Sequence, residues 1–218
     1  MFGKKGQLTL FVIIGILLLF SLSLGYYFVK QPFKIPKDLR PAENTLKNCI
    51  SNALEDGIEI MGSQGGYIKV PEFIAGSEIY PSTSQINFFG SIVPLWYYVS
   101  GNGIEGNQMP SISLMENQLS EYVKEKIVDC NFEDLENEGY LIKKENKLNV
   151  SVSIENSYVK AEVEWPVDFY FGELSARLTS HEVKLKSNFK KLYENAKMIF
   201  EKEKQEMFLE QYSLDVLT

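Results

Sequence analysis

Residues 147–165 read KLNVSVSIENSYVKAEVEW, and they indicate the fold class more clearly than any other stretch of the chain. Apolar and polar residues alternate on both sides of Glu155-Asn156-Ser157, a tripeptide typical of a tight turn. This pattern predicts an antiparallel hairpin, because successive side chains of a strand point to opposite faces of the sheet. Further β-branched or aromatic runs predict strands at residues 67–70, 85–89, 95–99, 167–171 and 176–185.

Three other segments carry apolar residues at steps of three and four, which is typical of amphipathic helices. The first helix is expected over residues 42–62, before Gly65-Gly66, and the second runs from Ser113, where Glu116 completes a capping box, to about residue 130. The third, over residues 187–212, has one broad apolar face formed by Phe189, Leu192, Tyr193, Ala196, Ile199, Phe200, Met207 and Phe208. The predicted fold is α+β, a mixed helix and antiparallel-hairpin domain with a long C-terminal amphipathic helix.

The N-terminal part of the chain predicts a membrane anchor. Residues 8–29 form an uncharged run of 22 residues, which as a helix is about 33 Å long and spans a bilayer core. The alternative, a removed secretory signal, needs a small-residue cleavage site, whereas this run ends in Tyr26, Tyr27 and Phe28. Aromatic residues are typical of the membrane interface, so a retained single-pass transmembrane helix is the preferred interpretation.

Three prolines, Pro32, Pro36 and Pro41, predict an extended and stiff spacer after this helix. The expected organisation is a leader and transmembrane helix at 1–29, a Pro-rich stalk at 30–41 and an extracytoplasmic α+β domain at 42–218. All 29 acidic side chains but only 19 of the 22 basic ones follow Lys30, which gives that part a formal charge of −10. Such an acidic surface argues against nucleic acid as a partner and against a head that lies flat on an anionic membrane.

Basic residues flank the apolar run on both sides, so the charge count alone does not fix its orientation. Lys4-Lys5-Gly6-Gln7, followed directly by that run, resembles the class III signal peptide of archaeal type IV prepilins. The resemblance covers about the first 30 residues and implies a cytoplasmic leader, a C-terminal domain outside the cytoplasm and cleavage between Gly6 and Gln7. Phe11 departs from the pattern, because many pilins carry Glu at this position to pair with a neighbouring subunit.

Four blocks within residues 1–145 together resemble a group of uncharacterised, exported, membrane-anchored proteins of small-genome archaea. The blocks are KKGQLTLF at 4–11, GSQGGYI at 62–68, LWYY at 95–98 and MENQLSEYV at 115–123. The resemblance implies export and anchoring and brings no activity with it. Members of this group often continue past the long helix into a β-rich domain, so the last helix is expected to need an outside partner.

Cys49 and Cys130 are the two cysteines of the chain, and both fall on the apolar faces of predicted helices. In an oxidising exterior they pair across a loop of about 80 residues, and the alternative is two separately buried thiols. The disulfide is the preferred interpretation for an exported protein. The chain has no Cys-x-x-Cys motif, so zinc binding or redox chemistry of that kind is not expected.

Two further motifs resemble ligand loops only in part. Residues 62–66 are glycine-rich but lack the Lys and Ser/Thr of a nucleotide loop, so they are interpreted as the end of a helix. Asp129-x-Asn131-x-Glu133 begins like a calcium loop, but Asp134 stands where Gly is needed and Tyr140 where Glu is needed. An acidic, solvated turn is the preferred interpretation.

His181 has no second His with which to share a metal, and it is expected at the surface. Asn149-Val150-Ser151 is a glycosylation sequon, which is allowed on an outward face. Aromatic residues gather at 95–98 and 165–171, where the preferred interpretation is sheet core and the alternative is a binding groove. The interaction candidates are Trp96, Tyr97, Tyr98, Phe200, Met207 and Phe208.

The sequence thus combines an anchor, a disulfide candidate and a long amphipathic helix without a convergent set of titratable groups. We expect a protein of the cell membrane that is not an enzyme, has no cofactor and no metal, and acts as a structural or interaction component of a surface assembly. Other surface proteins or further copies of the chain are the expected partners. Two alternatives stay open: a processed type IV pilin-like filament subunit, and an exported hydrolase acting on sugar or peptide.

Overall fold

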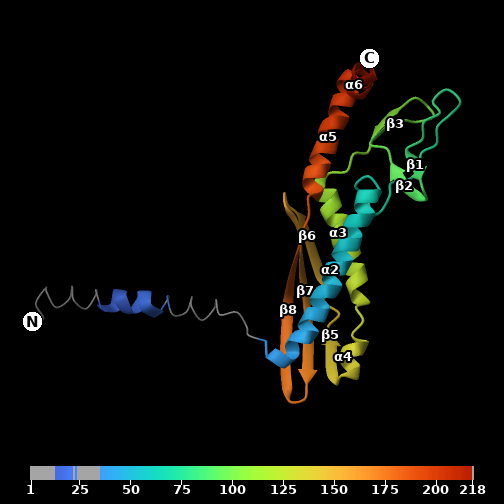
Figure 1. Cartoon of the computed structure of the whole chain (residues 1–218). Helices are drawn as coiled ribbons and strands as arrows, with labels where there is room; N and C mark the ends of the chain where they lie inside the picture. The colour runs from blue at the N-terminus through green and yellow to red at the C-terminus, as the bar shows by residue number, and fades with distance from the viewer. Residues whose placement is uncertain (1–12, 22, 24–34, 218) are drawn as a thin grey trace, which may run out of the picture. The chain divides into compact units, whose positions relative to one another are not determined.

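A computed structural model of the chain describes residues 13–21, 23 and 35–217 (Figure 1). The chain divides into two units, Met1–Pro36 and Lys37–Thr218. In the first unit, residues 13–21 and 23 are helical. The candidate cleavage site Gly6-Gln7 and most of the predicted anchor at 8–29 lie outside the described residues. No helix within the described ranges combines the length and the apolar character that crossing a membrane requires.

The second unit is built around a long central strand, β7 (Tyr158–Phe171). β8 (Leu174–Lys186) runs antiparallel along one edge of β7. The other edge is shared, because β6 (Asn149–Ile154) pairs with the first half of β7 and β5 (Tyr140–Lys144) pairs with the second half. The predicted α+β class with antiparallel strands is confirmed, and the predicted hairpin at 147–165 is the β6–β7 pair.

Trp165-Pro166 interrupts the ladder without ending the strand. The register between β7 and β8 shifts between Glu164 and Val167, as expected where proline lacks an N–H to donate. On the other edge, the four-residue gap between β5 and β6 faces the same point, where Trp165 Nε1 donates to the carbonyl oxygen of Glu145 at 2.8 Å. The two strands predicted before and after Pro166 are therefore one continuous strand with a bulge.

Two helices cover one face of this sheet: α2 (Arg40–Ser63) and α3 (Ile112–Val128). α2 packs on β8 and β7 and α3 packs on β6, and Figure 1 shows the two helices next to each other. Alternate residues of β7, from Val159 to Phe169, are buried beneath them. The helices contribute to this core with their own buried stripes, which comprise Leu46, Ile50, Leu54 and Met61 of α2 and Met115, Leu119, Val123 and Ile127 of α3. Gly57 lets the helices approach closely, since a Cβ there would lie 3.0 Å from Leu119 Cδ2.

The folded domain begins at Lys37 rather than at residue 42, which corrects the predicted boundary of the stalk. A 3₁₀ turn, η1 (Lys37–Leu39), leads directly into α2, and Pro41 lies in the first helical turn, where proline is tolerated. Leu39 is fully buried, and the hydroxyl of Tyr140 donates to the carbonyl oxygen of Asp38 at 2.6 Å. These contacts fix the start of the domain to β5, so the last part of the predicted extended spacer is helical.

The N-terminus of α3 differs from the predicted capping box. Ser111, not Ser113, caps the helix by accepting a hydrogen bond from the amide of Leu114 at 3.1 Å. Glu116 instead accepts from the amide of Ile154 at 2.9 Å, and Ser120 accepts from the amide of Val152 at 2.9 Å. Both side chains therefore occupy amides on the outer edge of β6, which protects that edge from pairing with another strand.

Between α2 and α3 the chain forms a separate lobe, residues 67–110, which we call the hairpin lobe. It contains two antiparallel pairs: β1 (Gln85–Phe88) with β2 (Ser91–Pro94), and β3 (Tyr97–Val99) with β4 (Glu105–Asn107). The strand predicted at 67–70 is wrong, because Tyr67 and Ile68 follow the helix end without strand pairing. The sequence prediction also missed β2, β4, β5 and the short helix α4 (Glu133–Asn137).

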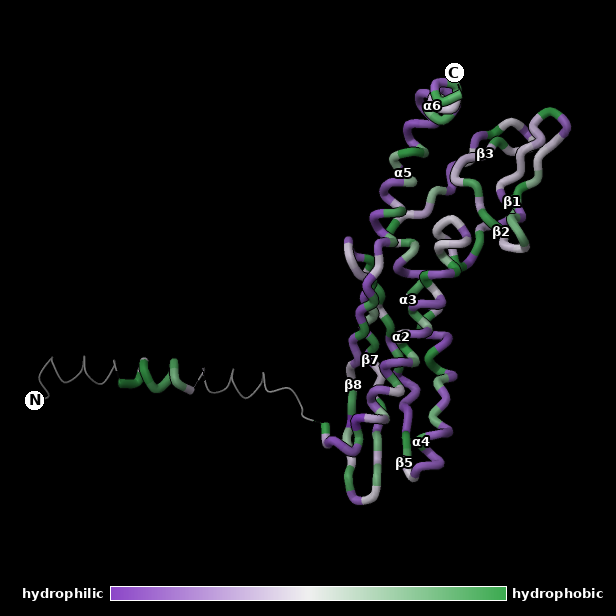
Figure 2. The backbone as a smooth tube through the Cα atoms, in the orientation of Figure 1, coloured by the Kyte–Doolittle hydropathy of each residue, from purple (hydrophilic) through white to green (hydrophobic). Residues whose placement is uncertain are grey.

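The last two helices are α5 (Phe189–Glu206) and α6 (Phe208–Leu217), and they replace the single helix predicted to end at residue 212. They meet at Met207, whose φ of +49° is left-handed and ends the first helix. Neither helix contains a buried residue. In Figure 2, hydrophobic and hydrophilic segments alternate along α5, as expected of an amphipathic helix.

Cys49 of α2 and Cys130, just after α3, form a disulfide with a Cα–Cα distance of 6.0 Å. The bond ties the two core helices together across 81 residues that include the whole hairpin lobe. In the chain-entropy account, closing a loop of this length stabilises the folded state by about 4 kcal/mol.

We therefore expect the double substitution Cys49→Ser, Cys130→Ser to lower the free energy of unfolding by about 4 kcal/mol in urea titrations. Dithiothreitol should shift the wild-type midpoint toward that of the variant and leave the variant unchanged. Equal midpoints for wild type and variant, each without reductant, would contradict a stabilising bond.

His181 is buried at 2% exposure, so the prediction of a surface histidine is wrong. Its position on β8 beside the bulge brings Nε2 within 3.0 Å of the carbonyl oxygen of Trp165, while Nδ1 has no hydrogen-bond partner within the described chain. Burial lowers the pKa of His181, and Lys47 lowers it further, against the opposing effects of the Trp165 carbonyl and Glu43.

A neutral buried histidine makes the fold sensitive to mild acid. The unfolded chain takes up this proton near pH 6.5, whereas the folded chain takes it up only at lower pH, so stability falls as the pH drops below about 6.5. The substitution His181→Gln is expected to flatten the pH dependence of the unfolding midpoint just below pH 6.5. If the wild type and H181Q lose stability in parallel there, His181 is not the group responsible.

Candidate interaction surface

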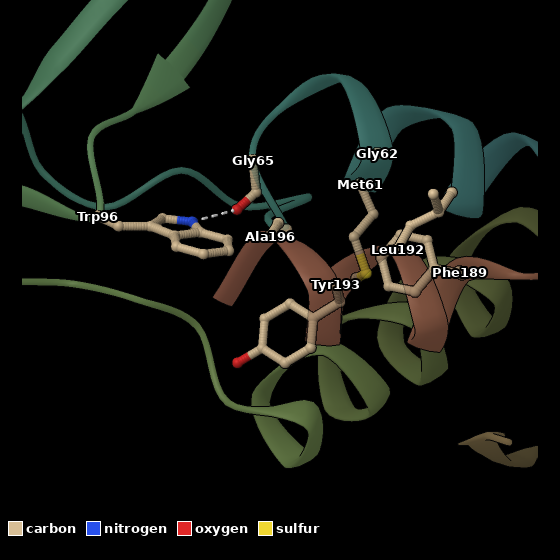
Figure 3. Close-up of a pocket in the computed structure, with 9 residues that line it drawn as sticks. Met61, Gly62, Gly65, Trp96, Phe189, Leu192, Tyr193 and Ala196 are labelled. Carbon is tan, nitrogen blue, oxygen red and sulfur yellow. Dashed lines mark hydrogen bonds between the residues drawn. The ribbon is translucent and has the colours of Figure 1, made fainter. Parts of the chain in front are cut away.

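Trp96 lies at the point where the hairpin lobe meets the C-terminal helix. Its ring packs edge-on against two rings of α5, with centroid distances of 5.8 Å to Tyr193 and 5.5 Å to Phe200. Its indole N–H donates to the carbonyl oxygen of Gly65 at 2.8 Å, a contact drawn in Figure 3. Trp96 thus connects three segments that are far apart in the sequence.

An apolar cavity of about 230 Å³ lies beside this contact, and we call it the α5 groove. Its walls come from the end of α2, from Trp96 and from the first half of α5; the lining residues are Met61, Gly62, Gly65, Gly66, Trp96, Phe189, Leu192, Tyr193 and Ala196. Figure 3 shows the Trp96 and Tyr193 rings on one side and Met61, Leu192 and Phe189 on the other. No charged side chain lines the groove.

Backbone geometry at the end of α2 shapes one wall of the groove. Gly65 and Gly66 have φ values of +64° and +98°, a left-handed conformation that glycine adopts without steric cost. At Gly66 a Cβ would lie 2.6 Å from Cγ of Pro110, so a larger residue does not fit. The glycine-rich stretch therefore ends the helix, as predicted, and also brings the Gly65 carbonyl to Trp96.

Hydrogen bonds from Gln108 hold Trp96 and its strand in place. The Gln108 side-chain amide donates to the carbonyl oxygens of Ser84 at 2.7 Å and Leu95 at 2.8 Å, and its backbone N–H donates to the carbonyl oxygen of Trp96 at 2.9 Å. The Tyr67 hydroxyl donates to the Gln108 carbonyl oxygen. On the opposite wall, the Tyr193 hydroxyl donates to the carbonyl oxygen of Pro110 at 2.7 Å.

Tyr67 is buried and Tyr193 is half-buried, and this burial changes the pKa of both phenols. Burial raises the pKa of Tyr67, with a smaller contribution from Tyr193, and burial likewise raises the pKa of Tyr193. Both phenols are therefore neutral hydrogen-bond donors at physiological pH. Their role at the groove is structural support.

The structure brings together some of the six predicted interaction residues and separates others. Trp96 and Phe200 are in ring contact, and Tyr97 lies beneath the Lys204 ammonium group of α5 at 4.9 Å from the ring centroid. Tyr98 lines a different cavity together with Gly101 and Gly106. The tyrosine pair is thus split between the two sides of β3.

Met207 and Phe208 lie at the junction of α5 and α6. Met207 is largely exposed, and the Phe208 ring stacks on Tyr212 at 6.1 Å and lies 5.4 Å below the Lys202 ammonium group. Many apolar side chains of the two helices are exposed; among them are Leu192, Met198, Ile199, Met207, Leu209, Tyr212, Val216 and Leu217. Leu192 is 66% exposed and Leu217 is 84% exposed, although both belong to an amphipathic pattern that normally packs on a core.

The remaining sequence candidates lie elsewhere. Asn149 is exposed at the start of β6. In the segment that begins like a calcium loop, the Asn131 side chain accepts a hydrogen bond from the amide of Glu133, the first residue of α4, at 2.7 Å. The described residues contain no group of three or more Cys, His, Asp or Glu side chains suited to a metal ion.

The α2 wall of the groove was not predicted from the sequence, because Met61 and the glycines that follow it show only the pattern of a helix end. Their proximity to Trp96 depends on the closure of the lobe across 31 residues. Comparison of the chain with known protein families, with curated proteins and with solved structures finds no match.

We expect the contacts of Trp96 to hold α5 against the hairpin lobe. Because this helix has no buried residue, Trp96→Ala is expected to release it and to raise the rate of limited proteolysis within residues 189–206 by roughly tenfold, equivalent to about 1.4 kcal/mol of local stability. Tyr193→Phe is the matched control, since it removes only the hydroxyl and should change the rate far less. Equal cleavage rates for W96A and wild type would show that other contacts hold the helix.

Proposed function

We propose that the protein is a non-catalytic, membrane-anchored component of a surface assembly, and that α5 and α6 are its docking elements. The observation that carries the proposal is the exposed apolar face of these two helices, in which no residue is buried. Apolar patches of this kind on soluble domains mark interaction sites, because water contact with them is unfavourable. A partner that covers the face removes this cost.

Placement outside the cytoplasm is supported by two independent features. Disulfides persist in oxidising compartments and are rare in the cytosol, and the Cys49–Cys130 bond joins the two core helices. The uncharged run at 8–29 has the length of a transmembrane helix, and its aromatic end is typical of a membrane interface. Together they support a single-pass protein with its C-terminal domain outside the cell.

The charge of the folded domain limits what the partner is. Residues 37–188 carry 13 basic and 23 acidic side chains, a formal charge of −10, which disfavours nucleic acid and anionic lipid. The exposed face of α5 and α6 offers apolar side chains between charges of both signs. A protein surface with an apolar stripe and a mixed charged rim is the complementary chemistry.

The test is to extract the full chain from membranes in mild detergent and quantify the proteins that accompany it. The double substitution Leu209→Glu, Val216→Glu is expected to reduce the principal companion at least tenfold, since it places charges in the apolar face of α6. The matched control Glu210→Gln, Asp215→Asn changes two charges on the same helix and should leave the companion in place. Retention of every companion by L209E/V216E would contradict docking through α6.

Topology is tested in intact cells. A protease added outside is expected to cleave the domain at 37–218, and alkylating reagents should label Cys49 and Cys130 only after reduction. Protection of the domain in intact cells, with cleavage only after lysis, would contradict the proposed placement. The N-terminal mass distinguishes the pilin-like alternative, because a processed subunit begins at Gln7.

A further inference from the structure

The tip of the β1–β2 hairpin carries an aromatic pair in an unusual backbone conformation. Phe88 pairs with Ser91, so the turn consists of only two residues, Phe89 and Gly90. Their φ values are +50° and +91°, and the amide of Gly90 donates to the Asn87 side chain at 2.9 Å. Two positive φ values in a two-residue hairpin turn are typical of the sequence Asn-Gly.

Phenylalanine is an unfavourable residue at the first turn position. A bulky side chain at positive φ is strained, whereas Asn tolerates this conformation. Phe89 is also 95% exposed, and its ring meets that of Phe88, 59% exposed, edge-on at 4.7 Å. Neither folding of the turn nor burial within the domain accounts for an aromatic residue at this position. A contact with another molecule does account for it.

The charge pattern of the hairpin is as unusual as its tip. Residues 79–104 contain no charged side chain in 26 positions, although 23% of the chain is charged. The lining of the α5 groove is uncharged too. Since the rest of the domain is strongly acidic, two copies repel each other over most of their surfaces, and these two neutral patches are where close approach costs least.

The α5 groove has the size and the chemistry to accept a phenyl ring. An apolar cavity of about 150 Å³ holds a benzene molecule, and the groove measures about 230 Å³. Met61, Trp96 and Leu192 offer the sulfur, aromatic and aliphatic surfaces against which phenylalanine packs well.

The β1–β2 tip of a domain does not reach the α5 groove of the same domain. Val93 and Pro94, at the far end of β2, lie next to Gly65 of the groove wall, because a Cβ at Gly65 would lie 3.5 Å from an atom of each. The tip lies at the opposite end of this four-residue strand, roughly 13 Å away along it. The Phe88–Phe89 tip and the α5 groove are therefore complementary surfaces that lie apart on one molecule. Each is available to a different molecule.

We propose that the Phe88–Phe89 tip of one copy docks into the α5 groove of a second copy. The proposal rests on the function proposed above and deepens it by naming one partner in the assembly, the chain itself. Because tip and groove are different surfaces, the contact is heterologous, and each added copy leaves one free tip and one free groove. Such a contact builds open chains of subunits, or rings if the rotation between copies closes.

The first test uses Phe89→Asn in the full chain, solubilised in mild detergent and measured by sedimentation velocity over a range of concentrations. Asn suits the turn, so F89N is expected to fold with a melting temperature equal to or above that of the wild type. Its self-association constant is expected to fall at least tenfold. The matched control is Ile79→Ser, which removes another exposed side chain of the same lobe, 80% exposed, and should leave association unchanged.

The second test exploits the polarity of the contact. Ala196→Trp is expected to fill the groove and, like F89N, to stop growth of the wild-type oligomers, with retained helicity by circular dichroism as its check. A mixture of F89N, which keeps its groove, and A196W, which keeps its tip, should form dimers and nothing larger.

Three results would overturn the proposal: a wild type that stays monomeric, an F89N variant that associates like the wild type, or a mixture that forms no dimers. A photo-crosslinking residue at position 89 that labels only lipid or only a different protein would overturn it as well. Each of these outcomes leaves docking through α6 intact, so failure of self-docking is distinguishable from failure of the proposed function.

Discussion

The C-terminal helices contain an apolar face that the rest of the described domain does not cover. Most helical stability in proteins comes from packing an amphipathic face, and a helix of 18 residues gains little without it. In α5 that support comes from the hairpin lobe, where Trp96 meets Tyr193 and Phe200 and Tyr97 lies beneath Lys204. The exposed remainder of the face, including Leu209 and Val216 of α6, needs a partner to exclude water.

The rest of the domain positions the contact between Trp96 and α5. The disulfide and the core of α2 and α3 hold the two ends of the hairpin lobe, and Gln108 fixes the strand that carries Trp96. The glycines after α2 turn the Gly65 carbonyl toward the indole. A small network of hydrogen bonds between segments distant in the sequence thus places Trp96 against a helix that otherwise extends beyond the core.

The parts of the fold that were predictable from the sequence are those with a local signal. Residues 147–165 combine alternation with turn chemistry, and the apolar stripes of α2 and α3 repeat at helical spacing, so both were predicted close to their observed bounds. The predicted disulfide is present, and it joins Cys49 within α2 to Cys130 just after α3.

The predictions from the sequence were wrong where the local residue pattern fits two structures, or where no local pattern marks the feature. Pro166 marks either a strand end or a bulge, and only pairing on both sides selects the bulge. Ser111 and Ser113 are both suitable caps, and the choice depends on Glu116 being used by the distant amide of Ile154. The helix break at Met207 contains no glycine or proline, so the sequence does not mark it. The residues of the α5 groove come together only through tertiary packing.

Hydrogen exchange of α5 and α6 tests the central claim most directly, because it reports whether these helices are covered. The account predicts fast amide exchange through residues 189–217 in the isolated full chain. It predicts strong protection of the same amides in material extracted from membranes with its companions still bound. Equal exchange in the two preparations, whether fast or slow, would contradict the claim that these helices exist to be covered by a partner.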